Sequence, residues 1–214
     1  MCTDVDAQMM LGAKKGDAGA LETLVQKHRG PIMHYMYRMV RNRAVSEELA
    51  QEVFLKVHRH RESYEATAKF TTWLYRIASH LALNWLRDHG RERLQYSLDA
   101  QPPGRTDRYF ADTAVNIDEW MILRLRIEEV RQAVNELPPR QRTVVLLHKF
   151  EGLECSEIGE LLGCSCQAVR SLLCRAYATL RARLAHVEAE CCHSKSAFTS
   201  NLRSASNSIG AWRV

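Results

Sequence analysis

The chain has 214 residues, a hydrophobic content of 46% and a net charge of +5, a composition that fits one or two compact domains. No stretch approaches the roughly 18 apolar residues that a membrane span needs. The acidic start at Met1–Asp6 lacks the basic-then-apolar order of a signal peptide. We therefore expect a cytoplasmic protein, in which the seven cysteines form no disulfide framework.

Charge is unevenly distributed along the chain. Residues 1–95 carry 15 Lys and Arg against 11 Asp and Glu, a net charge of +4. Residues 96–135 carry 5 against 7, a net charge of −2, and residues 136–185 carry 7 against 5, a net charge of +2. This pattern is typical of two nucleic-acid-facing domains joined by an acidic connector.

The first block has the apolar spacing of helices, and no run alternates long enough to indicate a strand. We expect Gly30-Pro31 to separate the first pair of helices, and Ser46 to cap the helix that follows. A third helix is predicted from about Thr71 to Arg87. The periodic apolar residues of the block are Leu21, Leu24, Val25, Leu49, Val53, Phe54, Val57, Trp73, Leu74, Ile77, Leu81 and Leu86.

The second block follows a loop signal at Gln101–Arg105. A helix is predicted from about Ile117 to Glu136, and Leu137-Pro138-Pro139 ends it. Pro139 suits the first turn of the next helix, where its missing N–H is harmless. The tail is rich in Ser, Asn and Cys, and we expect it to be disordered.

The segment Cys155–Arg175 predicts a helix-turn-helix. Gly159 lies where the first helix must approach the second closely, and Gly163 lies in the turn, where a positive φ is needed. Ser165 is placed to cap the second helix. An ordinary helical hairpin would match the apolar positions of the motif but not both glycines. The four positions expected to form its shared core are Ile158, Leu162, Val169 and Leu172.

In a helix-turn-helix the second helix enters the major groove of DNA. We expect Gln167, Arg170 and Ser171 to meet base edges, because Arg pairs with guanine and Gln with adenine. Arg175 lies further along and is expected to contact phosphate.

With these motifs, the chain resembles the sigma-70 family of RNA polymerase sigma factors, in the short extracytoplasmic-function (ECF) group. Residues 137–147 and the motif up to Ala176 resemble the start and body of that family's domain 4. Residues 47–54 (Glu-Glu-Leu-Ala-Gln-Glu-Val-Phe) and 70–78 (Phe-Thr-Thr-Trp-Leu-Tyr-Arg-Ile-Ala) resemble domain 2.

The resemblance implies an all-α protein with two small helical domains joined by a flexible linker. Domain 2 would span 5–95, the linker 96–116, and domain 4 with its preceding helix 117–185. The helix-turn-helix at 155–175 would recognise the −35 element, and 186–214 would form the disordered tail.

The resemblance also implies partners and roles. Bacterial core RNA polymerase would bind Glu48, Leu49, Gln51, Glu52 and Phe54. The −10 element would be recognised and melted by Lys69, Phe70, Trp73, Arg76, His80, Asn84 and Arg87, whereas −35 contacts would come from Ser165, Gln167, Arg170, Ser171 and Arg175. Members of the family commonly carry Asn in place of His80, which alters the expected −10 preference. No catalytic residue, cofactor or membrane insertion is expected, and the sequence leaves open whether an anti-sigma factor binds.

The cysteines allow two interpretations. Cys164 and Cys166 in the turn, together with Cys191 and Cys192, have side chains that suit zinc or copper(I). Their spacing matches no paired Cys-x-x-Cys site, however. The plainer interpretation is that they are unpaired thiols, with Cys155 and Cys174 as small buried apolar residues.

Two other functions compete with a sigma factor. A helix-turn-helix regulator that is not a sigma subunit would bind duplex DNA alone, but it has no need for the Glu48–Phe54 motif. An enzyme would carry a phosphate-binding glycine loop, a Ser/His/Asp set or a His-Glu metal motif, and the sequence contains none.

Overall fold

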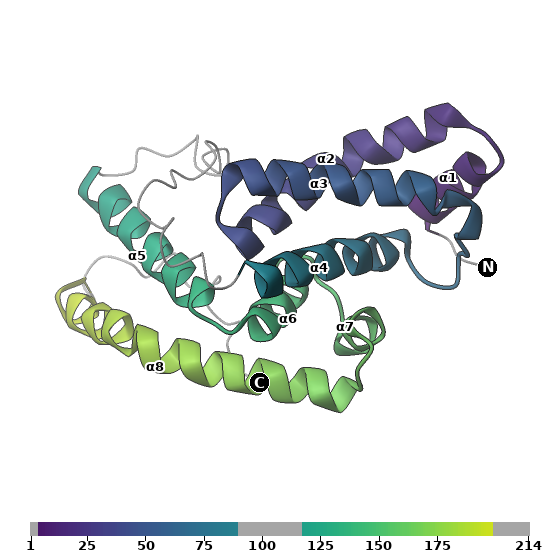
Figure 1. Ribbon diagram of the computed structural model, residues 1–214. Helices are drawn as coiled ribbons and strands as arrows, with labels where there is room; N and C mark the ends of the chain where they lie inside the picture. Colours follow the sequence, from purple (N-terminus) through teal and green to yellow (C-terminus); the bar gives the residue numbers. More distant parts are fainter. Residues whose placement is uncertain (1–3, 90–116, 199–214) are drawn as a thin grey trace.

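A computed structural model describes residues 4–89 and 117–198, with side chains up to residue 185 apart from 117–120, 122 and 123. Every regular element in these two ranges is helical, which confirms the all-α prediction (Figure 1). The first half contains α1 (Val5–Lys14), α2 (Ala18–Val40), α3 (Arg43–Arg59), the 3-10 turn η1 (Arg61–Ser63) and α4 (Phe70–Asp88). The second half contains α5 (Ile117–Asn135), α6 (Pro139–Lys149), α7 (Cys155–Leu162) and α8 (Cys166–Phe198).

The prediction that Gly30-Pro31 separates two helices is wrong, because α2 continues through Pro31. Pro31 lies on the exposed side of α2, whereas Ile32, Tyr35 and Met36 behind it are fully buried. A mid-helix proline costs about 3 kcal/mol, and burying each large side chain contributes roughly 1.5–3 kcal/mol. Tertiary packing therefore outweighs the local break.

The predicted start of the next helix is also wrong. α3 begins at Arg43, and Asn42 caps it by accepting a hydrogen bond from Val45 N at 3.2 Å. Ser46 is buried inside the first turn and its hydroxyl donates to the Asn42 carbonyl. Asn satisfies the unpaired N–H groups at the start of a helix at least as well as Ser does, so the helix starts one turn earlier.

In the second half, the predicted helix from Ile117 matches α5, and α6 begins at Pro139 as expected. α8 remains helical to Phe198, so the expectation of a disordered tail is wrong for residues 186–198. The remainder of the tail and the predicted linker at 96–116 lie outside the described residues.

The two halves pack directly against each other. α6 contacts α2 and α4, and α7 contacts α4. Arg142 on α6, only 3% exposed, donates to the carbonyls of Met39 at 2.7 Å, Leu137 at 3.1 Å and Asn135. Met39 lies in the last turn of α2 and Asn135 ends α5, so one guanidinium serves the carbonyl ends of two helices. That position favours a cation, because the helix dipole is negative there.

Candidate nucleic-acid interface

The helix-turn-helix has the geometry that its two glycines predicted. Gly163 ends α7 with φ 65°, in the left-handed region. A Cβ at Gly159 would lie 2.8 Å from the Cys164 carbonyl oxygen, so only glycine allows α7 to approach the turn this closely. Ser165 caps α8 by accepting from Ala168 N at 3.2 Å. These contacts confirm the predicted turn and cap.

The shared core of the motif differs from the prediction at two positions. Ile158 and Val169 are fully buried as expected, but Leu162 and Leu172 are only partly buried. Their neighbours Leu161 and Leu173 are the buried residues, at 1% and 7% exposure. A one-residue step along a helix turns a side chain by about 100°, and sequence spacing does not determine which of two adjacent leucines faces inward.

The outer face of α8 presents the residues predicted to read the −35 element. Gln167, Arg170 and Arg175 are exposed, and Ser171 is half-buried. Cys174 is also exposed, although the sequence suggested a buried thiol. It lies four residues after Arg170 and seven after Gln167, a helical spacing that could have placed it on this face.

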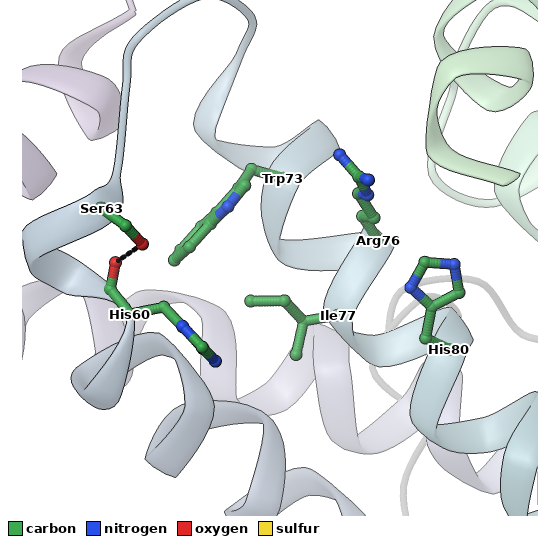
Figure 2. A pocket seen from close by; sticks show the side chains of 6 residues that line it. All are labelled: His60, Ser63, Trp73, Arg76, Ile77 and His80. Atoms are coloured by element: carbon green, nitrogen blue, oxygen red, sulfur yellow. Dashed lines mark hydrogen bonds between the residues drawn. The ribbon is translucent and has the colours of Figure 1, made fainter. Parts of the chain in front are cut away.

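A second feature is a pocket of about 350 Å³ between the end of α3, η1 and the first half of α4. Figure 2 shows the Trp73 ring extending from α4 toward Ser63, with Arg76 and His80 further along α4. Its volume is at the lower end for small-ligand sites. The pocket is lined by His60, Ser63, Trp73, Arg76, Ile77 and His80.

Of the residues predicted for the −10 element, the structure brings Trp73, Arg76 and His80 together in this pocket. Phe70 is 1% exposed and packs in the core against Trp73, so it does not present a free surface to DNA in this structure. Asn84 and Arg87 are exposed further along α4. The sequence assigned no individual −10 role to the other lining residues. Ser63 only began the segment expected to handle the −10 element, Ile77 was expected as an apolar helix position, and His60 lies before that segment with no helical periodicity to indicate it.

The pocket combines an aromatic ring with nitrogen-bearing side chains. Partial burial lowers the pKa of His80 below the ordinary histidine value of 6.5, and the nearby Arg76 charge lowers it further. The neutral imidazole of His80 is therefore favoured, with one ring nitrogen able to donate and the other able to accept. Arg76 supplies the positive charge of this group.

Acidic residues of the second half contact α4 and the residue that precedes it. Lys69 is exposed and lies 3.1 Å from Glu157 on α7. Tyr75, buried in α4, donates a hydrogen bond to Glu151. Burial raises the pKa of Glu151, whereas the Tyr75 hydrogen bond and the Arg38 charge lower it, with a net rise. The predicted −10 residue Lys69 is therefore engaged by the helix-turn-helix.

The face predicted to bind polymerase lies on α3. Glu48 and Gln51 are exposed, and Glu52 lies 3.7 Å from Lys56. Leu49 and Phe54 are half-buried and pack against the core instead. Leu55, absent from the prediction, is 50% exposed. Leu55 lies three residues after Glu52 and four residues after Gln51, so it belongs to the same helical face.

The described cysteines form no cluster. Cys155, Cys164, Cys166 and Cys174 are free thiols, and the part of the chain with described side chains holds no group of three metal-ligating residues. Cys191 and Cys192, the other half of the candidate metal site, have side chains outside that part. In the same part of the chain, no helix is long and apolar enough to cross a bilayer.

Comparison with known proteins accounts for both halves. Residues 24–92 match Sigma-70 region 2, and residues 127–180 match Sigma-70 region 4. The chain is 32% identical over 176 residues to the ECF RNA polymerase sigma factor SigW of Bacillus subtilis, covering 80% of this chain and 92% of that one. It is 35% identical over 177 residues to the RNA polymerase sigma factor CarQ of Myxococcus xanthus, covering 83% and 96%.

Solved structures share the fold. CnrH in complex with the cytosolic domain of CnrY has a TM-score of 0.63 at 20% identity, covering 86% of this chain and 99% of that one. RpoE in complex with the anti-sigma factor NepR from Bartonella quintana has a TM-score of 0.57 at 16% identity, covering 76% and 95%. Matches in both halves leave no room for a helix-turn-helix regulator built on an unrelated domain. The chain belongs to the ECF sigma factors of the sigma-70 family, proteins that act in transcription initiation.

Proposed function

We propose that this chain binds bacterial core RNA polymerase and directs it to promoters, reading the −35 element with α8 and the −10 element with the pocket on α4. The observation that carries this proposal is that the exposed outer face of α8 and the aromatic pocket on α4 lie on different matched regions of the chain. A single duplex-binding regulator needs only the first. The pocket suits a base that has left the helical stack.

At the −35 element, α8 enters the major groove. Gln167 and Arg170 stand exposed near its N-terminus, where a recognition helix meets base edges. Ser171 and Ser165 add hydroxyl contacts, and Arg175 contacts phosphate. Phosphate contacts set the position of the helix and base contacts set its specificity.

At the −10 element, an unpaired base stacks on Trp73 and its edge faces His80 and Arg76. Stacking on an aromatic side chain contributes roughly 1–3 kcal/mol per base, comparable to the energy required to unstack it. Lys69, Asn84 and Arg87 follow the strand outside the pocket. Lys69 must release Glu157 to do so, so we propose that the two halves separate on promoter binding.

The acidic face of α3 binds the polymerase. Glu48, Gln51 and Glu52 offer acceptors, and exposed Leu55 supplies the apolar centre that a protein interface needs. Phe54 and Leu49 support the face from below. The chain works in the cytoplasm without a cofactor or catalytic residue, since binding energy drives strand opening. The solved complexes make an anti-sigma protein a candidate partner.

In vitro transcription with bacterial core polymerase on a library of genomic fragments tests the proposal. We expect promoter-specific transcripts that depend on the added chain. Trp73→Ala should abolish strand opening but keep −35 binding, and Glu48→Lys should prevent assembly with polymerase. Absence of any specific transcript, with duplex binding by the free chain intact, would support a regulator instead.

A further inference from the structure

The N-terminal helix α1 lies before the matched region, which starts at residue 24, yet it is tied to the pocket. The Asp4 carboxylate accepts from two helix starts at once. Its Oδ1 accepts from Asp6 N at 3.1 Å in α1, and its Oδ2 accepts from Phe70 N at 2.8 Å in α4. Lys69, which precedes α4, provides no side-chain cap. A residue 66 positions away therefore caps the helix that carries Trp73.

The other end of α1 holds the segment that faces α4. Lys14, in the last turn of α1, donates to the Tyr64 carbonyl at 3.0 Å. Tyr64 directly follows η1, whose Ser63 lines the pocket. The cap and the last turn of α1 therefore form hydrogen bonds with both walls of the pocket. Asp4 contacts the α4 wall, and Lys14 contacts the η1 wall.

A cluster formed by Asp6, Lys27 and His28 fixes α1 itself. Asp6 is 5% exposed and lies 2.6 Å from Lys27 Nζ and 2.9 Å from His28 Nε2, both on α2. Burial alone raises the pKa of Asp6, but these two hydrogen bonds lower the pKa below its ordinary value, so the carboxylate stays charged. The position of Asp4, two residues away, is set by this cluster.

Aromatic contacts connect the two residues that α1 holds to the Trp73 ring in the pocket. The Trp73 ring packs against Tyr64 at 5.0 Å and Phe70 at 5.9 Å between centroids. Tyr64 and Phe70 are the two residues that Lys14 and Asp4 hold through their backbones. The ring of His28, in the Asp6 cluster, lies 5.4 Å from the Phe70 ring between centroids. Movement of either wall would therefore displace Trp73.

We propose that α1 is a brace that sets the width of the pocket, with Asp4 and Lys14 as positioning residues for recognition of the unpaired −10 base. The proposal rests on the proposed function of the pocket. Preorganised side chains bind more tightly because the protein does not have to order them on binding. Without the brace, the first turn of α4 frays. The affinity for the unpaired base then falls in proportion to the fraction of molecules that keep the pocket formed.

The test uses the full chain assembled with core polymerase. Binding is measured to a forked DNA with a duplex −35 element and a single-stranded −10 element, taken from a promoter found by transcription. A duplex that ends upstream of the −10 element reports −35 binding alone. Asp4→Ala and Lys14→Met should each weaken fork binding roughly fivefold, the equivalent of a lost helix cap, and should leave duplex binding unchanged.

Matched variants separate positioning from stability. Asp17→Ala removes the cap of α2, where Asp17 accepts from Ala20 N at 3.1 Å, and it should lower thermal stability without weakening fork binding. Asp4→Asn keeps one of the two acceptor oxygens, for either Asp6 N or Phe70 N, and should bind the fork more tightly than Asp4→Ala but less tightly than the unmodified chain. Should Asp4→Ala fail to fold, Lys14→Met tests the same brace from the other wall. Fork binding by Asp4→Ala and Lys14→Met equal to that of Asp17→Ala overturns the brace, whereas no fork binding by the unmodified holoenzyme overturns the proposed function itself.

Discussion

The helix-turn-helix depends on the absence of a side chain at Gly159. Gly159→Ala would place a methyl group 2.8 Å from the Cys164 carbonyl oxygen, a backbone atom that cannot turn aside. We expect a loss of about 1–3 kcal/mol in unfolding free energy, together with weaker −35 binding. Gly30→Ala is the control, because nothing lies within 4 Å of its added Cβ. It should stabilise the protein by about 0.5 kcal/mol, and urea denaturation measures both changes.

Glu151 predicts a pH dependence at the contact between the halves. Burial raises its pKa above the ordinary value of 4.5, so the folded protein holds this proton to a higher pH than the unfolded chain does. The charged carboxylate therefore lowers stability as pH rises above about 4.5. Glu151→Gln keeps an acceptor for Tyr75 and removes the charge.

We accordingly expect Glu151→Gln to be more stable than the unmodified protein at pH 7, and the advantage to vanish on acidification below pH 4.5. Urea midpoints measured across this range test the sign. Glu160→Gln, at an exposed position on α7, serves as the control and should show no such trend. Equal stability of Glu151→Gln and the unmodified protein at every pH would contradict the burial argument.

At the scale of elements, α8 separates base reading from phosphate binding along one helix. Arg170→Ala should weaken −35 binding by about 1–3 kcal/mol and relax the preference at one base pair. Arg175→Ala should weaken binding to all sequences alike and reduce the salt slope by about one. Arg181, exposed further along α8, provides a control variant of the same charge. Titrations at several salt concentrations with matched and mismatched duplexes distinguish the two roles, and a loss of preference from Arg175→Ala would reverse them.

Sequence patterns predicted the existence of the helices better than the residues at which the helices begin and end. α4 and α5 match their predicted ranges, and α6 begins at the predicted Pro139, because apolar spacing and prolines act locally. The predicted break at Gly30-Pro31 and the predicted start of α3 were wrong, because burial of Ile32 overrides Pro31 and Asn42 competes with Ser46 as a cap. Both outcomes depend on which side of the helix meets the core, and that is settled by neighbouring helices.

For the whole molecule, Arg142 joins two halves that are separate matches in sequence. Arg142→Ala leaves three carbonyl acceptors, two of them buried, without their donor, so we expect a loss of about 3 kcal/mol. Because the hydrophobic core is shared between the halves, the unmodified protein should unfold in one transition, and Arg142→Ala should separate it into two. Calorimetry tests this, with Arg140→Ala on the exposed side of α6 as the control. Two transitions in the unmodified protein would show that the halves are independent.

The sequence by itself determined the helical class, the helix-turn-helix and the family, since these depend on local spacing, glycines and short motifs. It also named Trp73, Arg76 and His80, which share one helix. Only the tertiary structure decided that His60 and Ser63 complete their pocket and that Phe70 is buried beneath it. It also decided that Glu157 forms an ion pair with Lys69. The contact from Asp4 to Phe70 spans 66 residues. Such contacts arise from packing between distant segments, and the periodicity of a single segment carries no information about its neighbours in space.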